Sequence, residues 1–382
     1  MKLASVVLRP GRERSVGLGH PWVLSGSVER VEGDPAPGDV VQVRSAAGTR
    51  LGTGDWDPVA QIRVRLFAFG KDEIDEEAWL DSAISRALGW RAAHPLLQGT
   101  DGLRLAHAEA DGLPGLTIDR YADWLSVRVG TPAMLRRAPK IAAILIAKTG
   151  ARGIWLRAEG APGALLAGEV PAEPVAIDER GRRYRVDLRH GQKTGFYLDQ
   201  RDARDLFARL AKGTRTLDLF AHTGGFARAA QDGGAAEVVA VESSEQAARL
   251  LEQNAPGCQV VLGDVNEFLR RESRSFDLIS VDPPPFAKRK RDVDAACRAY
   301  KDLNLHALRR AADGAHLLTF TCSHHVESEL FRKVVFSAAH DAGREVQLLA
   351  LLAAPPDHPV SLRHPQGEYL KGLLLRVSGA PS

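Results

Sequence analysis

Acidic side chains recur at the ends of successive apolar segments in the C-terminal half of the sequence. Glu242, Asp264 and Asp282 end or follow three of these segments, and Asp218 ends an earlier one. Ligands of a doubly wound sheet bind at the carboxyl ends of its strands, so we expect these carboxylates to meet. Glu242 is suited to bonding ribose hydroxyls, and Asp264 to accepting a hydrogen bond from an adenine amino group. Taken singly, Glu242 or Asp264 could equally be a solvated helix cap.

The turn after Asp218 contains the pair Gly224-Gly225, which lets the backbone pass close to a ligand. This turn is not a GxGxxG pattern, so a dinucleotide pyrophosphate is not implied. The acidic series and the turn together predict a nucleoside ligand without phosphates. The residues assigned to its binding at these strand ends are Asp218, Phe220, Thr223, Gly224, Gly225, Glu242, Asp264, Val265 and Asp282.

Cys322 is the cysteine whose context suits chemistry. It directly follows a predicted strand, at the same sheet edge as Asp282, and precedes Ser323-His324-His325 and a predicted helix. A thiol near a helix N-terminus or a protonated histidine has its pKa lowered from about 8.5, and the thiolate is the nucleophile. A buried, inert cysteine is the alternative. Cys258 and Cys297 lack such context and are interpreted as packing residues.

The elements that would position these side chains alternate regularly from residue 215 onward. Predicted strands cover 216–220, 237–241, 259–262, 276–281 and 316–321, and predicted helices cover 224–233, 244–254, 265–272, 294–312 and 326–341. Two further strands, 345–352 and 369–377, have no helix between them. The pattern predicts an α/β, Rossmann-like fold, a parallel sheet with helices on both faces and a terminal antiparallel hairpin.

Two more domains are predicted upstream. Short strands at 6–9, 40–44, 50–54 and 61–67 indicate a small, barrel-like β-domain. A mixed α+β domain follows, with helices at 76–93 and 133–148 and strands at 103–108, 116–119, 123–129 and 153–156. Residues 158–174 are interpreted as a linker and 174–188 as a hairpin. The predicted domains are therefore 1–72, 73–173 and 174–382.

Composition limits the functional classes. The chain of 382 residues has a net charge of +3, 44% hydrophobic and 26% charged residues, and three cysteines. It has no apolar run of membrane-spanning length and no signal-peptide pattern, so we expect a cytoplasmic protein without a membrane partner. Three scattered cysteines and no metal-ligand spacing predict neither a disulfide framework nor a metal site.

Positive charge is concentrated locally. The run Lys288-Arg289-Lys290-Arg291 follows Asp282 closely, and Arg12 and Arg14 lie in the β-domain. Such clusters are often simply solvated surface. Their positions favour phosphate binding, and therefore an RNA partner.

Several segments, in order along nearly the whole chain, resemble the bacterial 23S ribosomal RNA cytosine-C5 methyltransferase family. The resemblance is most specific in Lys193-Thr194-Gly195-Phe196-Tyr197-Leu198-Asp199-Gln200-Arg201. The other matching segments are His20–Val23, Asp111–Gly115, Thr223–Phe226, Asp282–Pro284, Tyr300–Asp302, Thr321–Ser323, Asp357–Pro359 and Tyr369–Gly372.

The resemblance implies a PUA RNA-binding domain, a mixed middle domain and a class I methyltransferase domain that uses S-adenosylmethionine. It implies that Cys322 adds to C6 of cytosine, that Asp282 bonds the base and that Phe286 stacks on it after the base is flipped out. The segment that would cover the cofactor and line the site contributes Lys193, Tyr197, Asp199, Gln200 and Arg201. The chain departs from the family at His222, Pro285 and Thr321, where Tyr, Lys and Ser are usual.

Two other functions remain open at this stage. Asp282-Pro283-Pro284-Pro285-Phe286 also resembles the motif of N-methyltransferases that modify exocyclic amines of guanine or adenine. A non-catalytic RNA-binding or ribosome-assembly factor is the alternative of a different class. A homodimer is left open.

Overall fold

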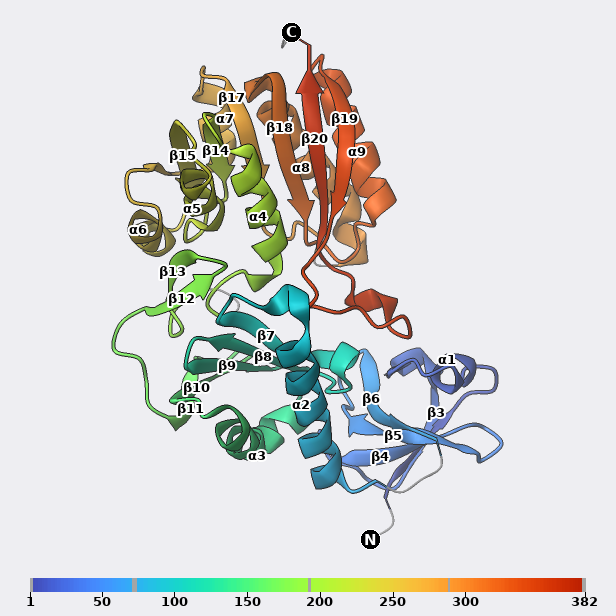
Figure 1. Cartoon of the computed structure of the whole chain (residues 1–382). Coiled ribbons are helices and arrows are strands. Elements are labelled where there is room, and N and C mark those ends of the chain that lie inside the picture. Colours follow the sequence, from blue (N-terminus) through green and yellow to red (C-terminus); the bar gives the residue numbers. More distant parts are fainter. Residues whose placement is uncertain (1–2, 71–73, 192–193, 288, 380–382) are drawn as a thin grey trace. The chain divides into compact units, whose positions relative to one another are not determined.

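The chain divides into two compact units (Figure 1). The computed structural model describes residues 3–70, 74–191, 194–287 and 289–379. Unit 1 contains the chain up to Ile177, with Asp187–Gly195 and Pro356–Gly367, and unit 2 contains Asp178–Val186, Phe196–Pro355 and the chain from Glu368 onward. The last segment of unit 1 comes from late in the sequence, which continuous boundaries at 72 and 173 did not anticipate.

The first part of unit 1 is a six-stranded β-sheet with strand order β2-β6-β5-β4-β1-β3. Four of these strands match the prediction closely. Strands β2 and β3 were missed, because β2 is very short and three of the five residues of β3 are charged. The elements are β1 (Ser5–Leu8), α1 (Arg14–Gly17), β2 (Trp22–Leu24), β3 (Val28–Glu32), β4 (Val40–Arg44), β5 (Arg50–Trp56) and β6 (Ile62–Phe69).

The second part of unit 1 is a five-stranded sheet packed on two long helices, with strand order β11-β10-β9-β8-β7. Asp75 caps α2, and Thr131 and the left-handed Gly150 begin and end α3, so both helix boundaries follow from local sequence. The elements are α2 (Glu76–Ala93), β7 (Gly102–His107), β8 (Leu116–Tyr121), β9 (Trp124–Val129), α3 (Pro132–Thr149), β10 (Gly153–Ala158) and β11 (Ala164–Gly168).

The interpretation of residues 158–174 as a plain linker was wrong. This segment contains β11, which pairs antiparallel with β10. Its residues are mostly small and partly exposed, so it lacks the alternating apolar pattern that identifies a strand in sequence. Its position beside β10 supplies the hydrogen bonds that its composition does not predict.

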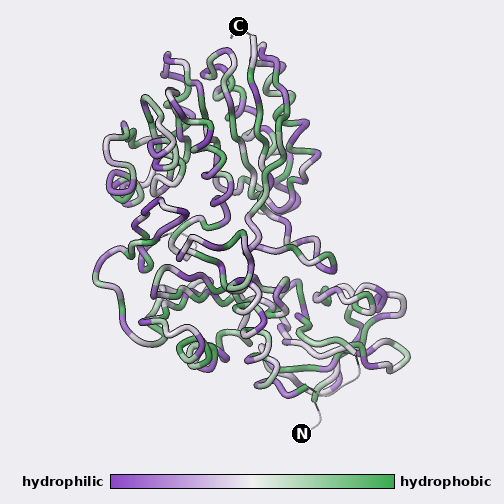
Figure 2. Tube along the Cα trace, viewed as in Figure 1, coloured by the Kyte–Doolittle hydropathy of each residue, from purple (hydrophilic) through white to green (hydrophobic). Residues whose placement is uncertain are grey.

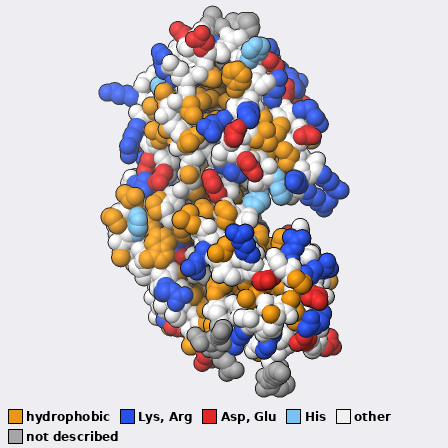
Figure 3. Space-filling view, turned by 90° about the vertical axis from the view of Figure 1, so that its right-hand side faces the viewer, with side chains coloured by type: hydrophobic (Ala, Val, Ile, Leu, Met, Phe, Trp, Pro, Cys, Tyr) orange, Lys and Arg blue, Asp and Glu red, His pale blue; other side chains and the backbone are white. Residues whose placement is uncertain are grey.

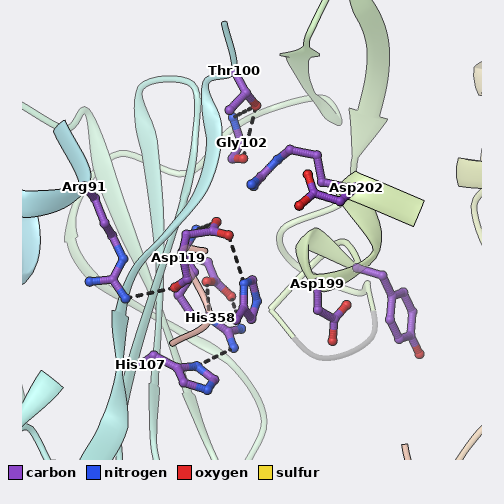
Figure 4. A network of polar contacts seen from close by, with 12 residues as sticks. Arg91, Thr100, Gly102, His107, Asp119, Asp199, Asp202 and His358 are labelled. Atoms are coloured by element: carbon purple, nitrogen blue, oxygen red, sulfur yellow. Dashed lines mark hydrogen bonds and ion pairs between the residues drawn. The ribbon is translucent and has the colours of Figure 1, made fainter. Parts of the chain in front are cut away.

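A buried polar network joins distant segments within unit 1 (Figure 4). Arg91 forms a bidentate ion pair with Asp111 and also donates to the carbonyl of Asp357. The side chain of Asp357 accepts the backbone N–H of Arg104, whose guanidinium is paired with fully buried Asp119. The loop at 356–367 is therefore fixed to the second sheet by charged groups. His358 is buried beside Asp357, with its Nδ1 3.1 Å from Asp357 Oδ1.

Unit 2 is built around a seven-stranded sheet with order β16-β15-β14-β17-β18-β20-β19. The first five strands in this order are parallel, and β20 pairs antiparallel with both β18 and β19. The predicted α/β sheet with a terminal antiparallel hairpin is confirmed. The strands are β14 (Arg215–Leu219), β15 (Glu237–Glu242), β16 (Gln259–Leu262), β17 (Phe276–Val281), β18 (Ala311–Thr321), β19 (Glu345–Leu352) and β20 (Lys371–Ser378).

Helices cover both faces of this sheet (Figure 1). Apolar residues of α4, α5 and α6 form one core cluster with the strands, and those of α7, α8 and α9 form another. Figure 2 shows the corresponding hydrophobic strands. The helices are α4 (Arg201–Leu210), α5 (Gly225–Asp232), α6 (Glu245–Asn254), α7 (Val265–Arg271), α8 (Val293–Arg310) and α9 (Ser328–Asp341), and the hairpin before them is β12 (Val175–Glu179) and β13 (Arg182–Val186).

None of the helices in the described ranges is both long and apolar enough to cross a membrane.

Candidate active site at the carboxyl edge of the sheet

Asp218 braces the turn that follows β14. Its carboxylate is buried and accepts hydrogen bonds from Ser280 Oγ on β17 at 2.6 Å and from the backbone N–H of Ala227 at 2.9 Å. Burial, opposed by these bonds and reinforced by Asp282 and Glu242, raises the pKa of Asp218 to about 7. Asp218 therefore links two strands to the first turn of α5.

The turn itself contains three left-handed residues. Phe220 and His222 have φ values of 60° and 48°, and Gly224 has 83°. Each non-glycine residue in this region costs about 1–3 kcal/mol and persists only where its surroundings fix it. The predicted glycine turn is thus a strained loop, of the kind found at ligand sites.

Glu242 and Asn254 hold this strained loop. The two carboxylate oxygens of Glu242 accept the backbone N–H groups of His222, at 2.8 Å, and of Ser244, at 2.7 Å. Asn254 Nδ2 donates to the carbonyl of Thr223 at 2.8 Å. Glu242 thus lies against the glycine turn, as the ribose-binding prediction requires.

Asp264 has a different environment. Its side chain is exposed and caps α7, where Oδ1 accepts the backbone N–H of Glu267 at 3.0 Å. This is the helix-cap alternative weighed from the sequence. Val265, the first residue of α7, is buried. The adenine-binding role of Asp264 and the cofactor-binding role of Val265 stay predictions.

A buried ion pair builds the segment that leads into α4. Arg204 donates two hydrogen bonds to Glu179 on β12, at 2.8 and 2.5 Å, and a third to the carbonyl of Tyr197 at 2.8 Å. Arg201 is completely buried and also contacts Glu179. Arg201 therefore stabilises the segment from its buried side. Tyr197 and Gln200 are the residues of this segment that reach the strand ends.

Tyr197 lies where the carboxyl ends of the strands meet. Its ring lies edge-on to His222 at 4.9 Å between centroids. Burial raises the pKa of the Tyr197 hydroxyl, and the charges of Asp282, Asp199, Cys322 and Glu242 raise it further. These residues come from four different parts of the sequence, so the predicted convergence of Asp282, Glu242 and Cys322 is present in the structure.

Gln200 and Asp199 each form a hydrogen bond to a side chain outside this segment. Gln200 Nε2 donates to Asp282 Oδ2 at 2.9 Å, which orients the carboxylate after β17. Asp199 Oδ2 accepts the hydroxyl of Tyr369 at 2.6 Å. Both side chains are buried, and Gln200 is in direct contact with a strand-end acid.

Cys322 is the accessible residue between two fixed neighbours. Thr321 Oγ1 donates to the hydroxyl of Tyr300 at 2.8 Å, and Ser323 Oγ bonds the same hydroxyl at 2.8 Å. Thr321 and Ser323 are fully buried, whereas Cys322 is partly exposed. The thiol points toward the strand-end motif, with Sγ 3.8 Å from the carbonyl of Pro283.

The other two cysteines are in unreactive environments. Burial raises the pKa of Cys258 to about 12, and it also raises the pKa of Cys297. Their thiols are therefore protonated at neutral pH, in agreement with their interpretation as packing residues. Among the described residues, no group of three His, Cys, Asp or Glu side chains could hold a metal ion.

Phe286 and the basic cluster lie on the segment between β17 and α8. Phe286 packs on Tyr300, at 4.7 Å between centroids, and remains partly exposed. Arg289, Lys290 and Arg291 are exposed, while Lys288 and Lys193 lie outside the described residues. In unit 1, Arg12 and Arg14 are also exposed. Figure 3 shows basic side chains distributed over the face that it presents.

The sequence assigned no role to Tyr300, Ser280 or Lys371, which support the site. Tyr300 and Lys371 lie in segments that carry the family resemblance, which was the available signal. Ser280 lies inside a buried strand, and nothing in its local sequence distinguishes it from an ordinary packing residue. Their roles depend on contacts across the sheet, which sequence spacing does not reveal.

Comparisons with known proteins agree with this geometry. A PUA-like domain family matches residues 6–69, and an S-adenosylmethionine-dependent methyltransferase family matches residues 142–300. Two solved structures are similar over 98% of this chain and 100% of their own, each at 23% identity. One is an S-adenosylmethionine-dependent methyltransferase from Streptococcus mutans, with a TM-score of 0.84, and the other is the methyltransferase SMU.776 complexed with SAH, with a TM-score of 0.86. The fold and the cofactor are thereby established.

Curated relatives match over almost the full chain. Ribosomal RNA large subunit methyltransferase I of Aeromonas hydrophila is 41% identical, covering 98% of this chain and 99% of the relative. The protein of the same name from Shewanella denitrificans is 42% identical, covering 97% and 99%. The Escherichia coli O139:H28 protein is 37% identical with the same coverage.

Glu242 offers a direct test of the cofactor site. A Glu242→Gln amide would turn an N–H donor toward one of the two backbone N–H groups that the carboxylate accepts, and would lose one acceptor for a ribose hydroxyl. We expect SAH binding, measured by calorimetry, to weaken about ten- to a hundredfold, or ~1.4–2.7 kcal/mol. Glu245→Gln, at an exposed position on α6, is the matched control and should bind normally. Wild-type affinity in Glu242→Gln would contradict the assignment.

Proposed function

The chain belongs to the ribosomal RNA large subunit methyltransferase I family, and we propose that it forms 5-methylcytosine in 23S ribosomal RNA. It is an S-adenosylmethionine-dependent methyltransferase. The observation that carries the choice of cytosine C5 is the position of Cys322, partly exposed between two buried, hydrogen-bonded neighbours and beside the segment that starts at Asp282. Methylation of an amine nitrogen has no use for such a thiol.

Carbon 5 of cytosine is a poor nucleophile and needs covalent activation. The Cys322 thiolate adds to C6, forming an Sγ–C6 bond and leaving C5 enamine-like. When bound, S-adenosylmethionine supplies a methyl group already activated by its sulfonium. C5 takes this methyl group as the bond from the methyl carbon to sulfur breaks and S-adenosylhomocysteine leaves. The C5 proton is then lost to a base, and the Sγ–C6 bond breaks to restore the ring and the free thiolate.

Asp282, Gln200 and Phe286 are suited to holding the base. Asp282 bonds the ring nitrogen or exocyclic amine in this proposal, and Gln200 fixes the orientation of its carboxylate. Phe286 has one side against Tyr300 and is partly exposed, so it offers a ring face to a flipped-out base. Tyr197, adjacent to His222 and the strand-end acids, closes the cofactor side of the site.

Replacement of the nucleophile separates this reaction from its alternative. We expect Cys322→Ala to reduce 5-methylcytidine formation by about a thousandfold or more, because no other group can form the adduct. The measurement is mass spectrometry of nucleosides from 23S ribosomal RNA incubated with each variant.

Two controls accompany this experiment. Cys297→Ala should retain full activity, and Cys322→Ala should still bind SAH, which shows that the site is folded. Methylation of a guanine or adenine amine that survives in Cys322→Ala would favour the N-methyltransferase instead. Absence of any methylation by the wild-type protein, with SAH bound, would favour a non-catalytic assembly factor.

The exposed cluster Arg289-Lys290-Arg291 supports phosphate contacts near the target base, since it begins three residues after Phe286 in the chain. Each phosphate contact contributes about 0.7 to the slope of log binding constant against log salt for single-stranded RNA. Reversing the three charges to Glu is expected to weaken RNA binding and reduce this slope by roughly 2.

A matched triple variant keeps the net charge equal. Arg249, Arg271 and Lys333 are exposed on helices α6, α7 and α9, and reversing them should leave the slope near its wild-type value. Equal slopes for the two triple variants would show that the cluster does not contact RNA phosphates. Arg12 and Arg14 are proposed to contact RNA through the β-domain by the same electrostatic means.

A homodimer is the oligomeric state we propose. The edge strand β19 exposes Leu348, Leu349 and Leu351 and contains no Lys or Pro, the residues that usually prevent edge pairing. Antiparallel pairing of two copies would bring Glu345 of one copy toward the apolar end of the other, with no like charges opposed. Light scattering should give a dimer mass for the wild type and a monomer mass for Leu351→Lys, and a wild-type monomer would contradict the proposal.

The domain limits at 72 and 173, with Pro356–Gly367 grouped with unit 1, and a cytoplasmic location complete the proposal. The first limit lies between β6 and α2, and the second lies between β11 and β12, where the chain passes from one sheet to the next.

A further inference from the structure

Lys371 occupies a buried position beside the proposed nucleophile. It begins β20 and pairs directly with Thr321, the last residue of β18 and the neighbour of Cys322. Its side chain is only 9% exposed, and Nζ donates a hydrogen bond to the carbonyl of Ser323 at 3.3 Å. Lys371 therefore contacts both neighbours of Cys322 in the chain. Its main chain pairs with Thr321, and its amine bonds the carbonyl of Ser323.

Cys322 is one of the groups whose charge acts on the Lys371 amine. The charges that favour the ammonium form are those of Glu368, Cys322 and Glu327. Burial acts in the opposite direction and lowers the pKa of Lys371 below its usual value. A buried amine of this kind keeps its proton most easily when an anion lies next to it.

His324, two residues after Cys322, does not provide this positive charge. Burial, together with His325 and Lys371, lowers the pKa of His324, so its ring is uncharged at neutral pH. Helix α9 begins only at Ser328, several residues beyond Cys322. Neither a protonated His324 nor the start of α9 therefore lies beside the thiol as an activating positive charge.

We propose that Lys371 is a positioning residue that holds Cys322 as a thiolate, through an ammonium–thiolate pair at the junction of β18 and β20. The inference rests on the proposed cysteine mechanism. Forming the pair moves one proton from Sγ to Nζ and changes no net charge. The pair also fixes the direction of the thiolate, because Nζ is already bound to the carbonyl of Ser323.

Other titratable groups near the pair must be taken into account. Several described groups act on Cys322 or Lys371, from the segment before α4, from α8, from the segment after β18 and from the segment before β20. They are Tyr197, Tyr300, His324, Glu327 and Glu368. Burial raises the pKa of Tyr197 and of Tyr300, so both hydroxyls stay protonated, and Lys371 is the basic side chain among these groups whose amine reaches the backbone beside Cys322.

The test is the pH dependence of alkylation of Cys322 by iodoacetamide, in the full chain with Cys258 and Cys297 replaced by Ala. Lys371→Met should move the midpoint of this profile upward by about one pH unit or more, since an adjacent cation is removed. Alkylation at pH 7 should then be about tenfold slower or more. Lys371→Arg, which keeps the charge, should restore most of the rate, and Lys333→Met on the surface of α9 should change nothing.

The outcomes separate this inference from the reaction itself. An unchanged midpoint in Lys371→Met, with SAH binding intact, would overturn the role of Lys371 even if Cys322→Ala remains inactive. A shifted midpoint together with an active Cys322→Ala would retain the pair but reject the cysteine mechanism. If Lys371→Met fails to bind SAH, the alkylation profile of Lys371→Arg is used instead. This variant keeps the positive charge, so a midpoint that differs from that of the wild type would also contradict the proposal.

Discussion

The carboxyl edge of the parallel sheet is the constraint on which the site depends. Parallel strands end at the same edge, so Asp218, Glu242 and Asp282, which are far apart in sequence, come together. Their proximity is unfavourable for the carboxylates, and it contributes to the raised pKa of Asp218. A concentration of buried negative charge of this kind suits a cationic ligand, and the sulfonium of S-adenosylmethionine is one.

The remaining structure around this edge holds groups in positions that they would not adopt alone. Glu242 fixes a turn with two left-handed non-glycine residues, and the buried Arg204–Glu179 pair fixes the segment that carries Tyr197. Tyr300 fixes the neighbours of Cys322 with a single hydroxyl. Such prearranged groups need little reorganisation when substrate binds, which is the main source of rate in methyl transfer from an activated donor.

Much of this organisation could be predicted from the sequence, because the strands and helices of unit 2 have regular apolar patterns. The bounds of β16, β17 and β19 agree with the predicted ones, and α2 in unit 1 does as well. The prediction failed where local pattern is weak, as in β2, β3 and β11. It also gave no role to Lys371, because the pairing of β18 with β20 arises from a hairpin whose register the sequence does not specify. Asp264 shows the remaining ambiguity, since one carboxylate can cap a helix and also bind a ligand.

The most direct measurement of the central claim is covalent trapping with RNA that contains 5-fluorocytosine. Fluorine at C5 cannot leave as a proton does, so a cysteine adduct that has accepted the methyl group should persist. The account predicts a stable protein–RNA complex that requires S-adenosylmethionine, with the modified peptide containing Cys322. Methylation of ordinary RNA by the same protein without any such complex, or with an adduct on another residue, would contradict it.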